Sequence, residues 1–500
     1  MHKIMKKNII RFLAIAFSCS LAWSCVSLDE YPKAIAAETF YSNVEECQAA
    51  VAAAVNDVTA TFRGNWYNLM EPWSDYNYAR ESSSFAFMND FDGLNVTGRG
   101  WSDEAWNGFY KGIRDCNCAL AKIPNTEKMS DADKNAYIGE LKFIRALGYF
   151  YLVRFWGKVP LRTEENINDF DMTTSSVEDI YKLILSDLEF AVKYCPAKPR
   201  TKGVPGVNVS KSLLSLVYLE LGDYQNAAKY SKEVIDSKEY SLVPADITST
   251  RPFDGIFVPF RKSSEEVFYS QCSNEQMGYT WVHPIYCSYL TCMVDGKTMG
   301  FGSLGIGLNK SNKWIVTWDD KDLRKLYNVA DFPLTTFADI DACNSKFIDY
   351  NERPLGLIFS PGEPPIIRYP EIMLTYAEAY TKAAGAPSQE AMEQINQIHR
   401  RGYGYAPYEP SPVDFNLSDY GTTDKFMELL IKEQCYEFWN EGKRWPFLKR
   451  LGKDIASKYI QEGKGKTPTE KNYLFPLPSS EFDYNKALDP KKDQNPGYNQ

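Results

Sequence analysis

Apolar residues recur at helical spacing along much of this chain, most clearly between Lys211 and Lys238, where two amphipathic stretches flank the turn Gly222-Asp223-Tyr224. The apolar positions are Leu213, Leu216, Val217 and Leu221 before the turn, and Ala227, Ala228, Tyr230, Val234 and Ile235 after it. This pattern predicts two helices joined by a tight turn, the hairpin unit of tetratricopeptide repeats. Gly222 suits the C-terminal cap of the first helix, and the small Ala227 allows the second helix to pack closely against it.

Similar amphipathic stretches alternate with long segments that lack a sustained period. The helical stretches span 44–62, 137–155 with 177–194, and 371–384 with 389–401, and the irregular segments span 64–100, 243–364 and 403–419. Helix hairpins of this kind bury their faces by stacking, so a right-handed superhelix is expected. The irregular segments are too long for simple connectors. We therefore expect a mostly α protein, a tetratricopeptide-like helix-hairpin superhelix that carries a large irregular, aromatic-rich insertion subdomain.

The amino terminus has the three-part pattern of a secretory signal. Four basic residues and no acid precede the apolar run from Phe12 to Phe17, and small residues follow. The segment Leu21-Ala22-Trp23-Ser24-Cys25 resembles a bacterial lipobox, although Trp23 and Ala22 depart from its best form and Cys19 is a competing cysteine. We predict a lipoprotein signal peptide at residues 1–24 and a lipidated tether at 25–40. Three acyl chains on Cys25 would hold firmly, whereas one chain is marginal.

The net charge, the cysteines and the histidines each argue against a class of partner or site. Loss of the four positive charges of the signal lowers the formal net charge from −9 to −13, which disfavours nucleic acid and anionic lipid surfaces. The eleven cysteines have no regular spacing, so a disulfide framework is not expected. The part after the signal contains only His283 and His399, so a zinc site is not expected either.

Four stretches carry a resemblance to a known family. They are Glu140 to Leu161, Arg368 to Tyr380, Ile431 to Arg450, and Leu474 to Glu481 with Gln494 to Tyr498. The first resembles a helix that ends in a Gly-x-Val-Pro-Leu turn, and the second a helix led by an arginine. In the third, Pro446-Phe447-Leu448 stands where an Asp-Leu pair is usual. Together they resemble the SusD/RagB family of outer-membrane nutrient-binding lipoproteins of Bacteroidetes, over almost the whole chain after the signal.

The resemblance implies one SusD-like domain over residues 41–500. Its helices would lie at about 41–62, 137–240, 371–401 and 424–450, and its ligand loops at about 64–100 and 243–364. It also implies a surface-exposed lipoprotein of the cell outer membrane that sits as a lid on a SusC-like, TonB-dependent transporter. Members present glycans, or in some cases peptides, to that transporter. No cofactor is expected, although some members carry a structural calcium ion, for which this chain shows no recognisable loop.

An enzyme is the alternative from another class. A glycoside hydrolase needs two carboxylates that flank the scissile bond, and composition cannot select such a pair. No Gly-x-Ser-x-Gly, His-Glu-x-x-His or complete phosphate-binding loop is present. The residues Arg145, Glu437, Glu441 and Arg444 lie at helical spacing on apolar helices, where paired charges satisfy one another between packed helices. We therefore expect these charges to be architectural and the protein to be non-catalytic.

Ligand contacts are expected in the irregular segments, because a sugar ring calls for flat aromatic side chains beside groups that bind hydroxyls. The first irregular segment offers Trp73, Tyr76, Asn77 and Arg80, and the second offers Trp281, Tyr286 and Trp314. We predict these seven as ligand-binding residues, and we assign Trp106, Trp156 and Trp439 to the core. The predicted function is therefore oligosaccharide binding at the cell surface, with peptide capture as its nearest rival and a pure protein scaffold as a weaker one.

Overall fold

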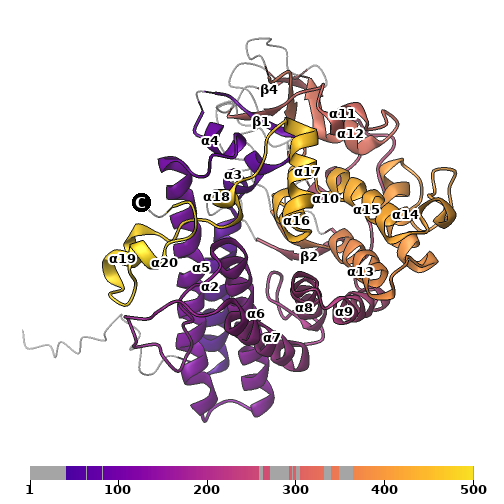
Figure 1. The fold of residues 1–500 in the computed structure, drawn as a ribbon. Helices are drawn as coiled ribbons and strands as arrows, with labels where there is room; N and C mark the ends of the chain where they lie inside the picture. Colours follow the sequence, from indigo (N-terminus) through magenta and orange to yellow (C-terminus); the bar gives the residue numbers. More distant parts are fainter. Residues whose placement is uncertain are drawn as a thin grey trace, which may run out of the picture.

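The computed structural model describes residues 41–63, 65–81, 83–257, 263–270, 305–331, 339–347 and 364–498, with the strand backbone at 292–294 and 297–299. Helices form most of this part of the chain (Figure 1). The longer ones are α2 (Val44–Arg63), α5 (Val96–Lys122), α6 (Asp131–Trp156), α7 (Val177–Tyr194), α8 (Val207–Leu221), α9 (Tyr224–Asp236), α13 (Tyr369–Ala384), α14 (Gln389–Gly402), α15 (Thr423–Glu437) and α17 (Lys453–Lys464).

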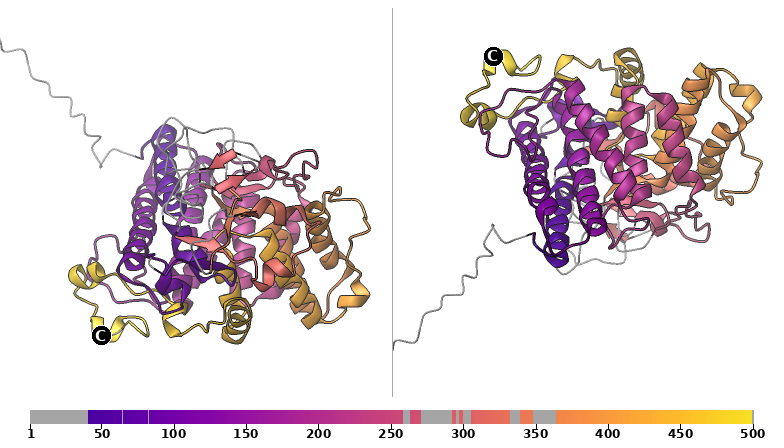
Figure 2. Two further views of the ribbon diagram at one scale, coloured as in Figure 1. Left: turned by 90° about the horizontal axis from the view of Figure 1, so that it is seen from above. Right: turned by 90° about the horizontal axis from the view of Figure 1, so that it is seen from below.

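These helices pack in sequence as an array of antiparallel hairpins. Each helix contacts the next one in the order α2, α5, α6, α7, α8 and α9. Helix α9 then contacts α13, which packs on α14 and α15. Figure 2 shows this succession as neighbouring helices whose colours pass from indigo to orange. The step from α9 to α13 omits residues 243–364, so the second irregular segment is an insertion into a continuous array. The expected mostly α, tetratricopeptide-like architecture is confirmed.

The hairpin of α8 and α9 has the local structure that its residues require. Gly222 adopts the left-handed conformation at φ 75°, and its N–H donates to the carbonyls of Leu219 and Tyr218. Asp223 caps α9 by accepting the N–H of Asn226. Ala227 is fully buried. The predicted turn, cap and close helix contact are therefore all present.

Serine and threonine begin several other helices, because their side chains satisfy N–H groups that lack a helical partner. Ser130, Ser176, Ser388 and Thr422 each accept the N–H of the third residue after them, at the starts of α6, α7, α14 and α15. These caps fix the entry points of the array.

The predicted helical region at 424–450 contains a sharp break. After α15 the chain turns through Asn440 at φ 59° and Gly442 at φ 68°, both left-handed, and then forms α16 (Arg444–Arg450). This short helix enters the interior of the array, where Pro446, Phe447 and Arg450 face residues of α6, α8 and α13. The groove that a helical array leaves on its inner side is therefore largely filled by the chain itself.

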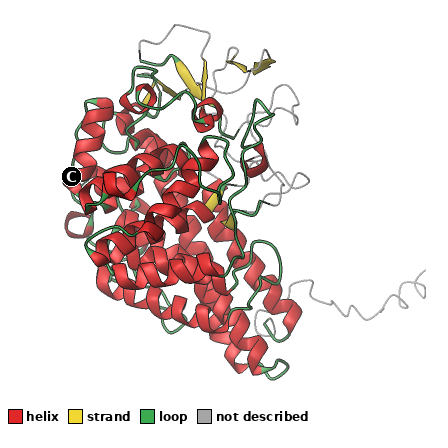
Figure 3. Cartoon of the chain, turned by 90° about the vertical axis from the view of Figure 1, so that its right-hand side faces the viewer, coloured by secondary structure: helices red, strands yellow, loops and turns green. Residues whose placement is uncertain are grey.

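The irregular segments build a small antiparallel sheet at one end of the array, shown in yellow in Figure 3. Its strands are β1 (Asn77–Ala79), β5 (Ile306–Leu308), β7 (Ala342–Asn344) and β6 (Val329–Asp331), in that order. Asn77 pairs with Leu308 and Ala79 with Ile306, so the first and second irregular segments share one sheet. Two further strand pairs join β2 (Glu266–Tyr269) to β8 (Pro365–Arg368) and β3 (Cys292–Val294) to β4 (Lys297–Met299).

Short helices complete the described residues. They are α3 (Trp66–Met70), η1 (Glu71–Trp73), α4 (Ala86–Asn89), η2 (Ile123–Asn125), α10 (Asp254–Phe257), α11 (Lys313–Val316), α12 (Leu323–Asn328), η3 (Leu417–Tyr420), α18 (Glu470–Tyr473), α19 (Ser479–Tyr484) and α20 (Pro490–Asp493). Within the part of the chain that the structure describes, no helix combines the length and apolar character needed to span a membrane.

A buried network of charges holds the array to the insertions. The guanidinium of Arg368 lies 2.8 Å from Glu265, Glu437 and Glu441, and Arg401 bridges Glu265 and Glu437. All five side chains are almost fully buried. Each carboxylate faces at least one cation, so the pairing of charges between packed helices predicted for Glu437 and Glu441 is present.

The two arginines predicted to be architectural are also paired, but with partners far from them in sequence. Arg145 of α6 forms an ion pair with Asp187 of α7 at 2.7 Å. Arg444 of α16 forms one with Asp75, beside β1, at 2.8 Å. Spacing along one helix therefore identified the charges correctly but could not identify their partners.

Candidate functional site

Four of the predicted ligand-binding residues are buried. Trp73 of η1, Tyr76 and Asn77 are each 0% exposed, and Trp314 of α11 is 4% exposed. Trp281 and Tyr286 lie outside the described residues, so their role remains a prediction. Arg80, which follows β1, is half-buried, and its N–H donates to the carbonyl of Gly305.

Aromatic stacking joins the two irregular segments. Tyr76 stacks on Trp439 with ring centroids 3.7 Å apart and an interplanar angle of 16°. Trp439 contacts Trp318 at 5.1 Å, and Trp318 stacks on Tyr436 at 4.2 Å. Trp314 meets the edge of Tyr436 at 6.3 Å. The ring faces of Tyr76 and Trp318 are therefore used within the protein.

The polar atoms around Tyr76 also form hydrogen bonds within the protein. Asn77 donates to Glu71 at 2.7 Å and accepts from the Nδ2 of Asn344 at 2.9 Å. The hydroxyl of Tyr76 donates to Glu71 at 3.0 Å and accepts the N–H of Asn440 at 2.9 Å. Burial raises the pKa of Glu71 to about 7, against the opposing effect of the Gly442 N–H and the Tyr76 hydroxyl.

These contacts correct the expectation that Trp73, Tyr76, Asn77 and Trp314 present themselves to a ligand. Their burial places them in the framework of the protein, with Asn77 in the sheet itself. Trp73 packs against Trp445 and Phe475, at centroid distances of 5.6 and 6.0 Å. Aromatic residues in an irregular segment can be core as readily as those in a helix, because partners far along the chain bury them.

Four residues that follow the edge strand β1 form a group that we call the β1 rim: Arg80, Phe85, Phe87 and Trp101. Phe87 is 52% exposed and Trp101 is half-buried, whereas Phe85 is only 8% exposed, with its ring 5.0 Å from that of Trp101. Phe85 packs closely on Gly305, where an added Cβ would lie 2.4 Å from its ring. The rim therefore combines aromatic side chains, a guanidinium and an edge of the small sheet.

Asn95 fixes the two halves of the rim relative to each other. Its side chain caps α5 by accepting the N–H of Gly98 at 2.9 Å, and its Nδ2 donates to the carbonyl of Ser84 at 3.1 Å. The loop that carries Phe85 is thereby tied to the helix that carries Trp101. Trp101 was not selected from the sequence, because it falls just beyond the irregular segment, in the first turns of a helix.

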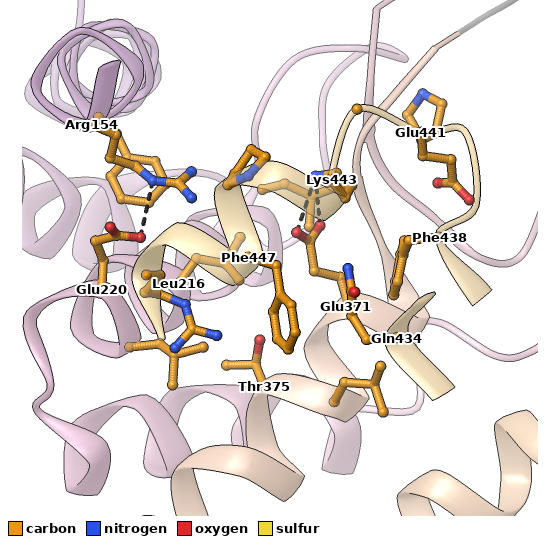
Figure 4. Close-up of a pocket in the computed structure, with 18 of the residues that line it drawn as sticks. Arg154, Leu216, Glu220, Glu371, Thr375, Gln434, Phe438, Glu441, Lys443 and Phe447 are labelled. Carbon is orange, nitrogen blue, oxygen red and sulfur yellow. Dashed lines mark hydrogen bonds and ion pairs between the residues drawn. The ribbon is translucent and has the colours of Figure 1, made fainter. Parts of the chain in front are cut away.

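A recess in the interior of the helical array is of a different kind (Figure 4). It is a cavity of about 90 Å³ between α6, α8, α13, α15 and α16. Ion pairs line it: Arg154 with Glu220 at 3.0 Å, and Lys443 with Glu371 at 2.9 Å. Because ligand pockets usually begin at about 300 Å³, this cavity suits a few water molecules and not an oligosaccharide.

The side chains of the β1 rim are of the types that bind sugars. Flat aromatic faces stack on the C–H face of a sugar, and a guanidinium donates to its hydroxyls. Among the residues that the structure describes, no group of three or more His, Cys, Asp or Glu side chains is arranged to hold a metal ion. The rim is therefore the candidate site for a neutral, hydroxyl-rich ligand.

Comparison with known proteins gives this site its context. A family model described as starch-binding and associating with the outer membrane matches residues 28–219, and the SusD family model matches residues 289–498. The SusD-like protein P2 of Formosa agariphila is 24% identical over 99% of this chain and 100% of its own length.

Solved structures show the same fold. Surface glycan-binding protein A from Bacteroides fluxus is 19% identical with a TM-score of 0.73, over 91% of this chain and 100% of its own. A laminarin binding SusD-like protein is 21% identical with a TM-score of 0.71, over 92% and 100% of the two chains. The two family models together account for most of the sequence. The chain therefore belongs to the SusD/RagB family of outer-membrane-associated, carbohydrate-binding proteins.

Proposed function

We propose that this protein captures an oligosaccharide at the cell surface and passes it to a SusC-like, TonB-dependent transporter without cleaving it. The observation that carries the proposal is the match of both SusD models to most of the chain. The starch-binding description of one model and the laminarin-binding relative support a glucan-like or other neutral glycan as ligand. The aromatic β1 rim supplies the chemistry for it.

The ligand would lie on the β1 rim. Phe87 and Trp101 would stack on sugar rings, and Arg80 would donate to hydroxyls. Trp281 and Tyr286 belong to the same insertion as β5, which is hydrogen-bonded to β1, and this supports their contribution to the same site. The buried side chains of Trp73, Tyr76, Asn77 and Trp314 would hold the sheet and its surroundings in place.

The state of two buried carboxylates, those of Glu437 and Glu441, supports binding without cleavage. Glu437 and Glu441 are engaged by Arg368, and both lie almost fully buried among helices. Burial by itself would raise the pKa of each carboxyl group, but Arg401 and Arg368 outweigh it at Glu437. Arg368 and Lys346 outweigh it at Glu441, so the pKa of each group lies below its ordinary value. A general acid needs a pKa near the working pH, so neither carboxylate suits that role.

The amino terminus supports the proposed location. A signal peptide at residues 1–24 and acylation of Cys25 would anchor the mature protein in the outer membrane, with residues 25–40 as its tether. The family description of outer-membrane association agrees with this arrangement. A surface anchor keeps the protein beside an outer-membrane transporter, which is where delivery of a captured glycan has to occur.

Affinity electrophoresis tests the proposal. A soluble form of the protein that begins after Cys25, and so lacks the anchor, is run through native gels cast with starch, laminarin, other neutral polysaccharides or none. Retardation by at least one polysaccharide is expected, and chromatography of the recovered glycan should show no shorter products. Unretarded migration in every gel, together with binding of peptides in solution, would replace this proposal with peptide capture. Appearance of shortened glycan would contradict the absence of catalysis.

A further inference from the structure

A second recess lies away from the β1 rim, between α5, the segment 157–176 that joins α6 to α7, and α19. Its volume is about 370 Å³, which is within the range of small-ligand pockets. Figure 2 shows this segment beside the C-terminal helices in both views. The residues that matter here are Asn107, Tyr110 and Arg114 of α5, Arg162 and Phe170 of the segment, and Glu481 of α19.

Three aromatic side chains, Trp106, Tyr110 and Phe170, line this groove among mostly polar residues. Phe170 is 75% exposed at its edge, and Tyr110 forms part of its floor with its hydroxyl donating to the carbonyl of Pro160 at 2.7 Å. The ring of Trp106 supports Tyr110 at 4.8 Å and is itself 2% exposed. A lone exposed phenylalanine needs no explanation, but one at the edge of a recess with an aromatic floor offers a second stacking surface.

The segment that carries Phe170 is held rigidly although it has no regular structure. The hydroxyl of Tyr149 donates to the carbonyl of Arg162 and accepts its N–H, both at 2.7 Å. Arg162 in turn donates to the carbonyl of Asp169 at 2.8 Å. Asn485 accepts the N–H of Met172 at 3.0 Å and donates to its carbonyl at 2.7 Å. Phe170 is thus fixed from both sides, which reduces the ordering cost of binding.

The charges around the groove cancel in pairs. Lys111 lies 2.9 Å from Asp57, Arg114 lies 2.7 Å from Asp115, and Arg162 lies 3.8 Å from Glu481. Each of the three cations that line the groove thus has a carboxylate close to it, which weakens its attraction for an anionic ligand. The exposed amide of Asn107 offers both a donor and an acceptor. A neutral ligand with hydroxyl groups fits this surface best.

We propose that this groove is a second binding site for a neutral oligosaccharide, independent of the β1 rim. Phe170 and Tyr110 stack on the apolar faces of sugar units, and Asn107 and Arg114 bind their hydroxyls. The inference rests on the proposed function for the class of its ligand. Two sites on one molecule would hold a long glycan at two points and raise its effective affinity.

Counting sites by calorimetry tests the inference, with maltoheptaose and laminarihexaose as probes. The wild-type mature protein should bind two molecules of the recognised probe per chain. Phe170→Ala and Asn107→Ala should each weaken one of the two sites about tenfold or more, because removing an anchoring contact has effects of this size. Tyr484→Ala is the matched control: Tyr484 is 83% exposed on the neighbouring α19 but does not line the groove, so binding should not change.

The outcomes separate the two proposals. One site per chain in the wild type, or two sites that both survive Phe170→Ala and Asn107→Ala, would overturn the second site and leave the proposed function intact. No binding of either probe, together with unretarded migration in every polysaccharide gel, would overturn both. A third variant, Trp101→Ala, should weaken binding at the β1 rim. If Phe170→Ala loses one site but keeps the one that Trp101→Ala weakens, the groove is established as the second site. Unchanged circular dichroism spectra show that each exposed substitution leaves the fold intact.

Discussion

Glu437 shows at the scale of one residue how much the fold depends on matched buried charges. Its carboxylate lies 2.8 Å from Arg368, also contacts Arg401, and is 3% exposed as a residue. Replacing it with alanine would leave two buried guanidinium groups short of a partner. We expect Glu437→Ala to lower the free energy of unfolding by about 3–5 kcal/mol, measured by urea denaturation.

The matched control for that change is Glu428→Ala. Glu428 faces Lys458 at 3.7 Å, and both side chains are largely exposed. Exposed pairs contribute about 0–1 kcal/mol, so the midpoint of unfolding should hardly move. Equal losses in the two variants would contradict a special role for the buried network.

Glu378 makes the stability depend on acid pH. Burial alone would raise its pKa, but Arg450 and Lys382 outweigh this and lower the pKa from 4.5 to about 2. Because the pKa of Glu378 is lower in the folded protein than in the unfolded chain, ionisation of this carboxyl group stabilises the folded state. This stabilisation is complete above pH 4.5 and is lost as the pH falls toward 2.

We therefore expect Glu378→Gln to be less stable than the wild type by about 3 kcal/mol at pH 6 and to approach it near pH 2. Urea titrations at a series of pH values measure the difference. A difference in stability between the two proteins that stays constant across this pH range would show that Arg450 and Lys382 do not lower the pKa of Glu378.

Residue identity predicted the core better than it predicted the site. Trp106, Trp156 and Trp439 were assigned to the core, and they are 2%, 0% and 0% exposed. Trp73 has no helical neighbours at the right spacing, yet it is buried because Trp445 and Phe475 reach it from the far end of the chain. Absence of periodicity in a sequence therefore says little about exposure.

At the scale of elements, the helix hairpins could be predicted because their signals are local. The stretches at 177–194 and 389–401 correspond to α7 and α14 almost residue for residue. The four-stranded sheet could not be predicted, because its strands have three residues each and β1 pairs with β5 over more than 200 positions, as Asn77 does with Leu308. A period of two residues cannot emerge in so short a run.

Gly222 gives an element-scale test. It closes α8 in the left-handed conformation at φ 75°, with only the Tyr224 hydroxyl near its Cβ position, at 4.0 Å. We expect Gly222→Val to destabilise the protein by about 1–2 kcal/mol, because a branched side chain opposes this conformation. Gly222→Asn should cost less, since asparagine tolerates it. Thermal unfolding compares the two, and equal losses would point to lost packing instead of backbone strain.

At the scale of the whole molecule, the array is a frame that presents two surfaces, the β1 rim and the groove beside α5. The proposed lipid anchor determines where these surfaces act. We expect Cys25→Ala to abolish incorporation of labelled palmitate and to release the protein from the outer-membrane fraction. It should also reduce co-purification with a SusC-like transporter, since the two would no longer share a membrane. Unchanged incorporation of palmitate would show that another residue is acylated, with Cys19 as the first alternative.

The measurement that tests the account most directly is a calorimetric titration of the β1 rim. Wild-type protein, Trp101→Ala and the control Tyr405→Ala, which changes a 41% exposed tyrosine on the loop after α14, are titrated with the oligosaccharide that retards the protein best. The account predicts that Trp101→Ala weakens binding at one site about tenfold or more while Tyr405→Ala does not. Equal binding by all three proteins would contradict the β1 rim as the glycan site.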